Sequence, residues 1–178
     1  MDRRDFLQKT LVGAAVAAAA PWNLLARPYP QGEGLGKPGE SNPLRLSFQE
    51  NTAPGETLAE RLDYMEAHGV TGFEPGGKNL SARVGELKQA LRGRNISVSA
   101  ICAGFSGFIL SEQPEVRAEF DRTMREIIAA AGELGSTGVI MVPAFNHQVP
   151  VMPHTPQTRD YLVEQLRKLG DYAREQGT

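Results

Sequence analysis

The sequence predicts an α/β fold in which four strand-and-helix units form a parallel sheet. Residues 139–142 are apolar without interruption and are bounded by Gly138 and Pro143, as expected for a short strand buried on both faces. Helical patterns lie on both sides of this run. Two helix-to-strand joints, residues 68–73 and 134–139, are also alike, which indicates a repeated unit.

The expected strands are short apolar or alternating runs that end at a Gly-, Pro- or Asn-containing loop. In chain order they are residues 44–48, 70–74, 96–102 and 139–142. Because a helical segment follows each of them, the strands are expected to run parallel with right-handed crossovers.

The expected helices carry apolar side chains at helical spacing together with a start or stop signal. They are residues 57–67, 80–91, 114–134 and 155–177. His68 followed by Gly69 is a stop signal for the first helix. Thr155 and Pro156 are an N-cap and first-turn pair for the last one.

The N-terminus predicts export. Arg3 and Arg4 precede Phe6, and a weakly hydrophobic, alanine-rich segment follows, which resembles a bacterial twin-arginine signal over residues 1–26. An amphipathic N-terminal helix is the alternative. Residues 27–43 are rich in Gly and Pro without periodicity and are interpreted as a flexible linker. The folded domain is expected over residues 44–178, in the periplasm or otherwise exported.

Composition excludes several classes of protein. The formal net charge of -2 argues against a nucleic-acid partner, which requires a basic face. The single cysteine, Cys102, rules out an internal disulfide. No apolar run approaches the roughly 18 residues of a membrane span, so no stable membrane insertion is expected. A homo-oligomer is possible.

A closed (β/α)8 barrel has eight such units and takes about 250 residues, and this chain supplies four units. The fold class is therefore α/β, with the first four βα units of a (β/α)8 TIM barrel. Three interpretations remain open: a truncated piece of a longer protein, a self-sufficient open parallel sheet, or a half-barrel that pairs with a second chain.

Several segments at the strands and their exits resemble the xylose-isomerase-like barrels, and more narrowly the sugar phosphate isomerase/epimerase group. These segments are Leu44, Ser47 and Phe48, then residues 72–76, 98–104 and 135–139, and the pair Val142-Pro143. The resemblance covers residues 44–178 and implies the first half of that family's barrel, whose fold is shared by metal-dependent apurinic endonucleases.

The resemblance also implies a divalent metal, Mn²⁺, Mg²⁺, Co²⁺ or Zn²⁺, in the full-length protein. In such enzymes glutamate, aspartate, histidine and glutamate from strands five to eight hold it. No position of this sequence matches them. We therefore assign no metal ligand and no catalytic residue, and this chain alone is expected to bind no metal and to be inactive.

Four residues near expected strand ends are candidates for sugar contact. Glu74 can accept hydrogen bonds from hydroxyls, and the alternative is an ion pair with Lys78. Asn146 and His147 follow the fourth strand; the alternatives for His147 are an exposed loop residue or a metal ligand. Phe105 can form a wall against a sugar ring or can pack in the core.

The expected function is metal-dependent isomerisation or epimerisation of a small-molecule sugar by proton transfer next to a carbonyl. Whether the sugar is phosphorylated stays open. One alternative is a metal-dependent hydrolase or lyase of the same barrel type. The other is a carbohydrate-binding barrel without catalysis.

Overall fold

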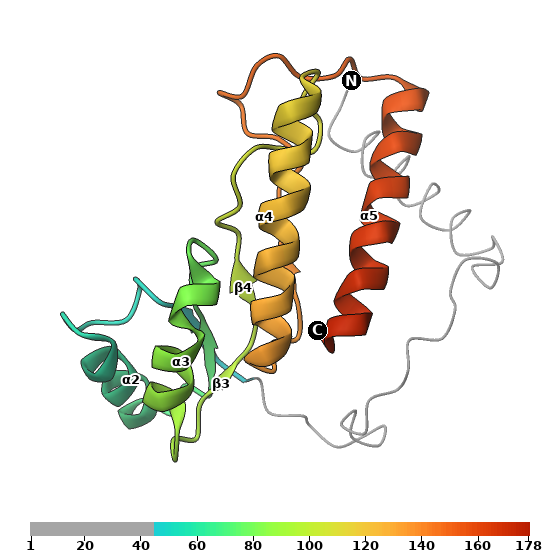
Figure 1. Ribbon diagram of the computed structural model, residues 1–178. Helices are drawn as coiled ribbons and strands as arrows, with labels where there is room; N and C mark the ends of the chain where they lie inside the picture. Colours follow the sequence, from blue (N-terminus) through green and yellow to red (C-terminus); the bar gives the residue numbers. More distant parts are fainter. Residues whose placement is uncertain (1–44) are drawn as a thin grey trace, which may run out of the picture. The chain divides into compact units, whose positions relative to one another are not determined.

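The computed structural model describes residues 45–178; the expected signal and linker, residues 1–26 and 27–43, lie outside the described residues. Strands and helices alternate as predicted (Figure 1). In order they are β1 (Ser47–Gln49), α2 (Leu58–Ala67), β2 (Gly72–Glu74), α3 (Leu80–Leu91), β3 (Ser97–Val98), β4 (Ile101–Cys102), α4 (Pro114–Glu133), β5 (Val139–Ile140) and α5 (Pro156–Gln176).

All described strand pairs are parallel, which confirms the predicted architecture. One sheet has the order β1-β2-β3, and a second sheet pairs β4 with β5. The helices α3 and α4 lie in front of the strands in Figure 1. The result is a set of four βα units of a (β/α)8 barrel whose sheet is open.

The third predicted strand is not one strand but two, β3 and β4, separated by Ser99 and Ala100. Phe73 pairs with Val98, an offset of 98 - 73 = 25, whereas Gly76 pairs with Cys102, an offset of 102 - 76 = 26. One extra residue has therefore entered this strand, as in a β-bulge. The interruption falls beside Pro75 of the neighbouring strand, which has no N–H to donate to the ladder.

The bulge decides which side chains face the helices. Val98 and Ile101 are both buried in the same hydrophobic cluster although they are three residues apart. In a regular strand two such side chains would point to opposite faces. Because of the extra residue, the Ile101 side chain faces the helices like that of Val98. The Cys102 side chain then faces the opposite, inner side, where it contacts Gln49.

The prediction that residues 139–142 are buried on both faces is wrong. Only Val139 and Ile140 form β5; Val139 is half-buried, and the Ile140 side chain is 44% exposed. Val139 packs against the helical layer, whereas within residues 45–178 Ile140 belongs to no hydrophobic cluster.

The core lies between strands and helices, and α4 connects its two parts. One part joins the sheet to α2, α3 and α4, with Phe73, Leu62, Leu87 and Ile127 among its buried members. The other joins α4 to α5, with Phe120, Met124, Ile128 and Leu169 among its members. Because α4 presents apolar side chains to both parts, it fixes the position of the loop that precedes it.

Helix starts follow the sequence signals. Thr57 caps α2 in a capping box with Glu60, and Thr155 caps α5 through the Thr158 N–H. Helix α3 differs, because its N-cap residue Asn79 is left-handed and makes no capping hydrogen bond. None of the helices within residues 45–178 combines the length and apolar character needed to cross a bilayer.

Candidate functional site

Three polar side chains meet at the carboxyl ends of β1, β2 and β4. Gln49 and Glu74 are paired residues of neighbouring strands, and the Gln49 Nε2 donates to Glu74 Oε1 at 2.7 Å. The same nitrogen lies 3.5 Å from Cys102 Sγ. We call Gln49, Glu74 and Cys102 the strand-end layer. Carboxyl ends of parallel strands are where barrels of this type bind ligands.

Small side chains lie beneath the strand-end layer, two residues earlier on the first two strands. The hydroxyls of Ser47 and Ser99 are hydrogen-bonded at 2.7 Å. A Cβ on Gly72 would lie 2.6 Å from the Ser47 Cβ, so only glycine fits beside that serine. We call Ser47, Gly72 and Ser99 the floor. Its side chains are small and polar, unlike the bulky branched residues that usually fill such barrels.

An ion pair holds the loop after β2. The Glu50 carboxylate accepts the Gly76 N–H at 3.1 Å and binds the Arg83 guanidinium through both of its oxygens. Burial disfavours ionisation of Glu50, but the hydrogen bonds from Arg83 and Gly76 outweigh it and lower the pKa of the carboxyl. Glu50 thus fastens the first two βα loops together beside Glu74.

The Cys102 thiol is held in its neutral form. Partial burial raises its pKa above the ordinary value, and the nearby Glu74 carboxylate raises it further. A thiolate nucleophile needs the opposite environment. Cys102 therefore contributes a weakly polar, uncharged surface to the strand-end layer.

Of the four residues predicted to contact sugar, Glu74 is central to this layer. Within residues 45–178 its carboxylate accepts a hydrogen bond from the Gln49 side chain, and it forms no ion pair with Lys78. Phe105 packs against both hydrophobic clusters and meets Phe120 edge to face at 5.0 Å. Of the two alternatives for Phe105, the structure shows packing in the core. Contact of its ring with a sugar stays a prediction.

Asn146 and His147 lie on the loop between β5 and α5 and are exposed. The His147 ring stacks on Phe145 with centroids 5.8 Å apart. No hydrogen bond among the described residues connects either side chain to Glu74, so the structure does not join them to the strand-end layer. Their predicted contact with substrate stays a prediction.

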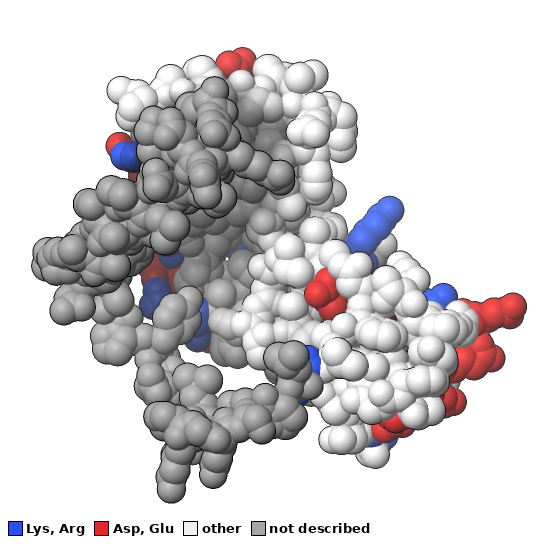
Figure 2. All heavy atoms as spheres, turned by 180° about the vertical axis from the view of Figure 1, so that it is seen from behind, with Lys and Arg blue, Asp and Glu red and all other residues white. Residues whose placement is uncertain are grey.

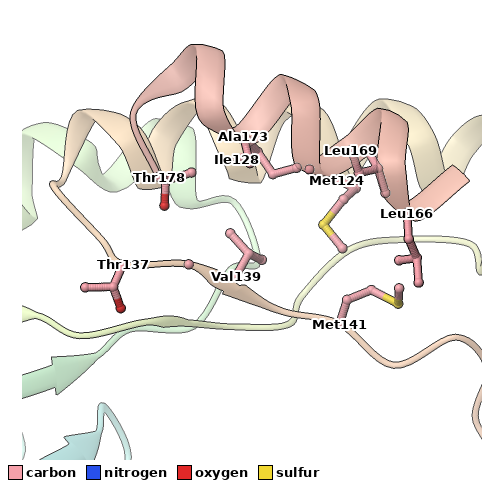
Figure 3. A pocket seen from close by; sticks show the side chains of 11 residues that line it. Met124, Ile128, Thr137, Val139, Met141, Leu166, Leu169, Ala173 and Thr178 are labelled. Carbon is pink, nitrogen blue, oxygen red and sulfur yellow. The ribbon is translucent and has the colours of Figure 1, made fainter. Parts of the chain in front are cut away.

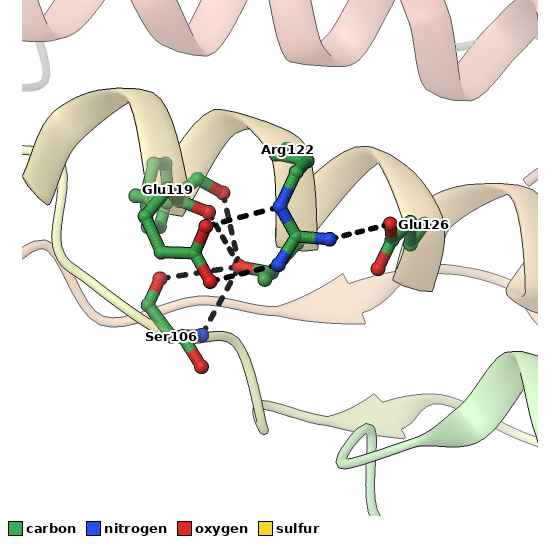
Figure 4. A network of polar contacts seen from close by, with 6 residues as sticks. Ser106, Glu119, Arg122 and Glu126 are labelled. Carbon is green, nitrogen blue, oxygen red and sulfur yellow. Dashed lines mark hydrogen bonds and ion pairs between the residues drawn. The ribbon is translucent and has the colours of Figure 1, made fainter. Parts of the chain in front are cut away.

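A polar cavity of about 300 Å³ lies on the helical side of the same loops, between the start of α3 and α4. Lys78 lines it, together with Arg122 and Glu126. The Arg122 guanidinium is already bound by two carboxylates of its own helix, Glu119 at 2.7 Å and Glu126 at 2.6 Å (Figure 4).

A second cavity, of about 310 Å³, is apolar and lies among α4, β5 and α5 (Figure 3). Met124, Val139, Met141 and Leu169 point into it, and Gly170 borders it. It lacks the convergent polar groups of the strand-end layer.

The residues present do not fit a metal site. Within residues 45–178 no three His, Cys, Asp or Glu side chains lie close enough together to hold an ion. Glu74 and Cys102 are the two neighbouring donors of the strand-end layer, and Gln49 occupies the third position. No metal-dependent step can be derived from these side chains.

Sequence reasoning missed Gln49 and Glu50. A signal for Gln49 was present, because Leu46 and Phe48 alternate with Ser47 and place Gln49 on the polar face of β1. Glu50 had no such signal, since its partner Arg83 lies 33 residues away.

Parallel strands that each lead into a helix, with polar groups gathered at their carboxyl ends, are features of (β/α)8 barrels. Residues 62–178 match the family described as xylose isomerase-like TIM barrel. The chain therefore belongs to the xylose isomerase-like TIM barrel family.

A curated sequence and a solved structure from Escherichia coli are similar to this chain. The 3-dehydro-D-guloside 4-epimerase of strain K12 is 27% identical over 142 residues, which is 76% of this chain and 54% of the relative. The crystal structure of a 3-keto-D-glucoside 4-epimerase is similar with a TM-score of 0.64 and 25% identity, over 76% of this chain and 54% of that one. The chain thus spans about half the length of the curated relative it matches.

A third similarity concerns the fold alone. The crystal structure of IOLI protein with a bound zinc atom has a TM-score of 0.55 and 20% identity, over 76% of this chain and 49% of that one. Sugar epimerases are therefore among the proteins that this chain is similar to, and a protein crystallised with zinc shares its fold.

Proposed function

We propose that this protein takes part in the epimerisation or isomerisation of a sugar, and that the described residues supply part of the substrate-contacting half of the barrel. The observation that supports this most directly is the Gln49–Glu74 pair at neighbouring strand ends, 2.7 Å apart, above a floor of hydroxyls. The names of the E. coli relatives, both 4-epimerases, support the class of reaction.

Epimerisation removes a proton from the carbon next to a carbonyl and returns it to the other face, through an enediolate. In the proposal Glu74 accepts hydrogen bonds from sugar hydroxyls. Gln49 keeps that carboxylate turned toward the substrate and offers its own amide oxygen to a further hydroxyl. Holding the ring in a fixed orientation contributes to rate by aligning the reacting carbon.

The proposal includes a divalent metal, Mn²⁺, Mg²⁺, Co²⁺ or Zn²⁺, with ligands outside residues 45–178. Such an ion would supply a Lewis acid for the carbonyl and the adjacent hydroxyl. The zinc bound by a protein of similar fold supports this part of the proposal. Export through the twin-arginine route is proposed on the Arg3-Arg4 motif alone.

The test is incorporation of solvent deuterium during sugar turnover. Keto sugars are incubated in D₂O with the 178-residue chain, and with any natural form that extends past Thr178, each with and without a chelator. We expect the extended form to give epimer carrying deuterium and the chelator to abolish it. Metal content of both forms is measured in parallel.

Other outcomes favour the other functions. Cleavage of abasic DNA without sugar turnover would indicate a hydrolase or lyase. Sugar binding that is unchanged by the chelator, without turnover, would indicate a carbohydrate-binding barrel. A stoichiometric metal on the 178-residue chain would refute the placement of the ligands outside it.

A further inference from the structure

Glu50 contacts the chain directly before and directly after Pro75. Its backbone N–H donates to the Glu74 carbonyl at 3.0 Å, and its carboxylate accepts the Gly76 N–H at 3.1 Å. Pro75 is buried and has no N–H of its own to donate. The end of β2, from which the Glu74 side chain projects, is therefore fixed to the residue that follows Gln49 in the sequence.

The Glu50 carboxylate is in turn oriented by α3. Arg83, near the start of that helix, donates to both carboxylate oxygens. This is the least exposed ion pair within residues 45–178. Other charged side chains of the described part project from the surface, as Figure 2 shows along one margin of that face. A bidentate pair fixes the orientation of a carboxylate in addition to neutralising it.

Glu50 is suited to holding the site rather than to binding a ligand. Its carboxylate already accepts hydrogen bonds from both guanidinium nitrogens of Arg83 and from the Gly76 N–H, which occupy most of its roughly four acceptor sites. Gln49 and Glu74 differ from it, because they are joined to each other by a single hydrogen bond. Their remaining polar atoms can meet a substrate.

The other side of the same segment is held by the backbone alone. The Cys102 N–H donates to the Pro75 carbonyl at 3.0 Å, and the Gly77 N–H donates to the Cys102 carbonyl at 2.9 Å. A side-chain substitution leaves these contacts in place. Changes at Glu50 can therefore shift Glu74 without altering any residue of the strand-end layer.

We propose that Glu50, oriented by Arg83, is a positioning residue for sugar binding and sets the place from which the Gln49–Glu74 pair meets the substrate hydroxyls. This inference rests on the proposed function and adds to it a residue that does not touch the substrate. Ordering the pair before the sugar arrives lowers the cost of binding. Loss of Glu50 should therefore weaken contact with the sugar even in a protein that stays folded.

The first measurement needs no sugar. Nitrogen-15 NMR of the 178-residue chain at neutral pH records the Gln49 side-chain amide, which donates to Glu74. Gln49→Leu assigns its signal, and Glu74→Gln gives its position without the carboxylate. We expect Glu50→Ala to move the signal at least halfway to that position. Glu50→Gln removes the same charge but keeps an acceptor for the Gly76 N–H, so its effect should be smaller.

The second measurement is sugar turnover by a natural form that extends past Thr178. Glu50→Ala should raise KM about tenfold, the factor expected for loss of one hydrogen bond to a charged group, and Glu50→Gln about threefold. The kcat should stay within about twofold, because this contact is made equally in the ground and transition states. Two controls should leave KM unchanged. Thr155→Ala loses stability by uncapping α5, and Glu86→Gln removes the other carboxylate near Arg83.

Circular dichroism shows whether each variant is folded, and Glu50→Gln decides the matter should Glu50→Ala fail to fold. An unmoved Gln49 signal together with an unchanged KM would overturn the inference and leave the proposed function standing. An equal rise of KM in Thr155→Ala would attribute the effect to lost stability and would also overturn it. Absence of sugar turnover in the extended form would refute the proposed function, whereas the Gln49 signal would still decide whether Glu50 positions the pair.

Discussion

The Glu50–Arg83 pair allows the sharpest test of how the candidate site is held. Glu50→Gln removes the charge and keeps an oxygen that can still accept the Gly76 N–H. The side chains of Glu50 and Arg83 are 13% and 27% exposed, so the pair lies between a surface and a buried salt bridge. Charge-assisted hydrogen bonds of this kind predict a loss of about 1–2 kcal/mol in the free energy of unfolding at neutral pH.

The pH dependence has a definite sign. Because folding lowers the pKa of Glu50 below its ordinary value of 4.5, its stabilisation is fully present above that value and is lost as the pH falls through the lower, folded-state pKa. Between neutral pH and the acid range, Glu50→Gln should therefore lose less stability than the parent protein. The two should converge once Glu50 is protonated in both states.

Urea unfolding followed by circular dichroism measures the effect across this pH range. A double-mutant cycle with Arg83→Met isolates the pair, and we expect a coupling energy of about 1 kcal/mol or more. Glu86→Gln is the matched control, since Glu86 also faces Arg83 but at 3.6 Å and with 57% exposure, and its effect should stay below about 0.5 kcal/mol. A coupling energy near zero, with parallel pH profiles, would refute the reasoning.

Three further predictions concern packing, capping and electrostatics. A Cβ on Gly85, within α3, meets nothing within 4 Å, so Gly85→Ala should raise the free energy of unfolding by about 0.5–1 kcal/mol. Gly77→Ala should lower the free energy of unfolding by about 2 kcal/mol or more, because the new methyl collides with the carbonyl of the facing loop. Urea titration of both glycine variants measures this contrast, and equal effects of the two substitutions would contradict the prediction. Thr57→Ala should cost about 1 kcal/mol by removing the capping box of α2, and a loss below about 0.3 kcal/mol in the same titration would speak against that cap. Because the Glu74 carboxylate raises the pKa of Cys102, Glu74→Gln should speed alkylation of the thiol at pH 8 by about twofold. An unchanged rate would show that the charge of Glu74 does not affect the thiol.

The sequence allowed the alternation of strands and helices to be predicted because each signal is local. The apolar spacing of α3 and the Thr155-Pro156 start of α5 depend only on nearby residues. The bulge at Ser99 and Ala100 could not be predicted from its own strand. It falls where Pro75 interrupts the hydrogen-bond ladder of the neighbouring strand.

The same distinction applies to the candidate site. Glu74 could be chosen from its place at a strand end, and the structure places it in the strand-end layer. Cys102 faces Gln49 only because the bulge has shifted its register. Asn146 and His147 follow β5 in the sequence, but nothing local fixes the direction of an exposed loop, so their position relative to Glu74 could not be derived.

The floor has a consequence for how the barrel can vary. Protein interiors leave few voids, and barrels of this kind normally fill their lower part with large aliphatic groups. Ser47, Gly72 and Ser99 contribute little volume there. In a closed barrel, strands facing this floor would have to supply the missing bulk, and a larger residue in the floor would require a smaller one opposite it.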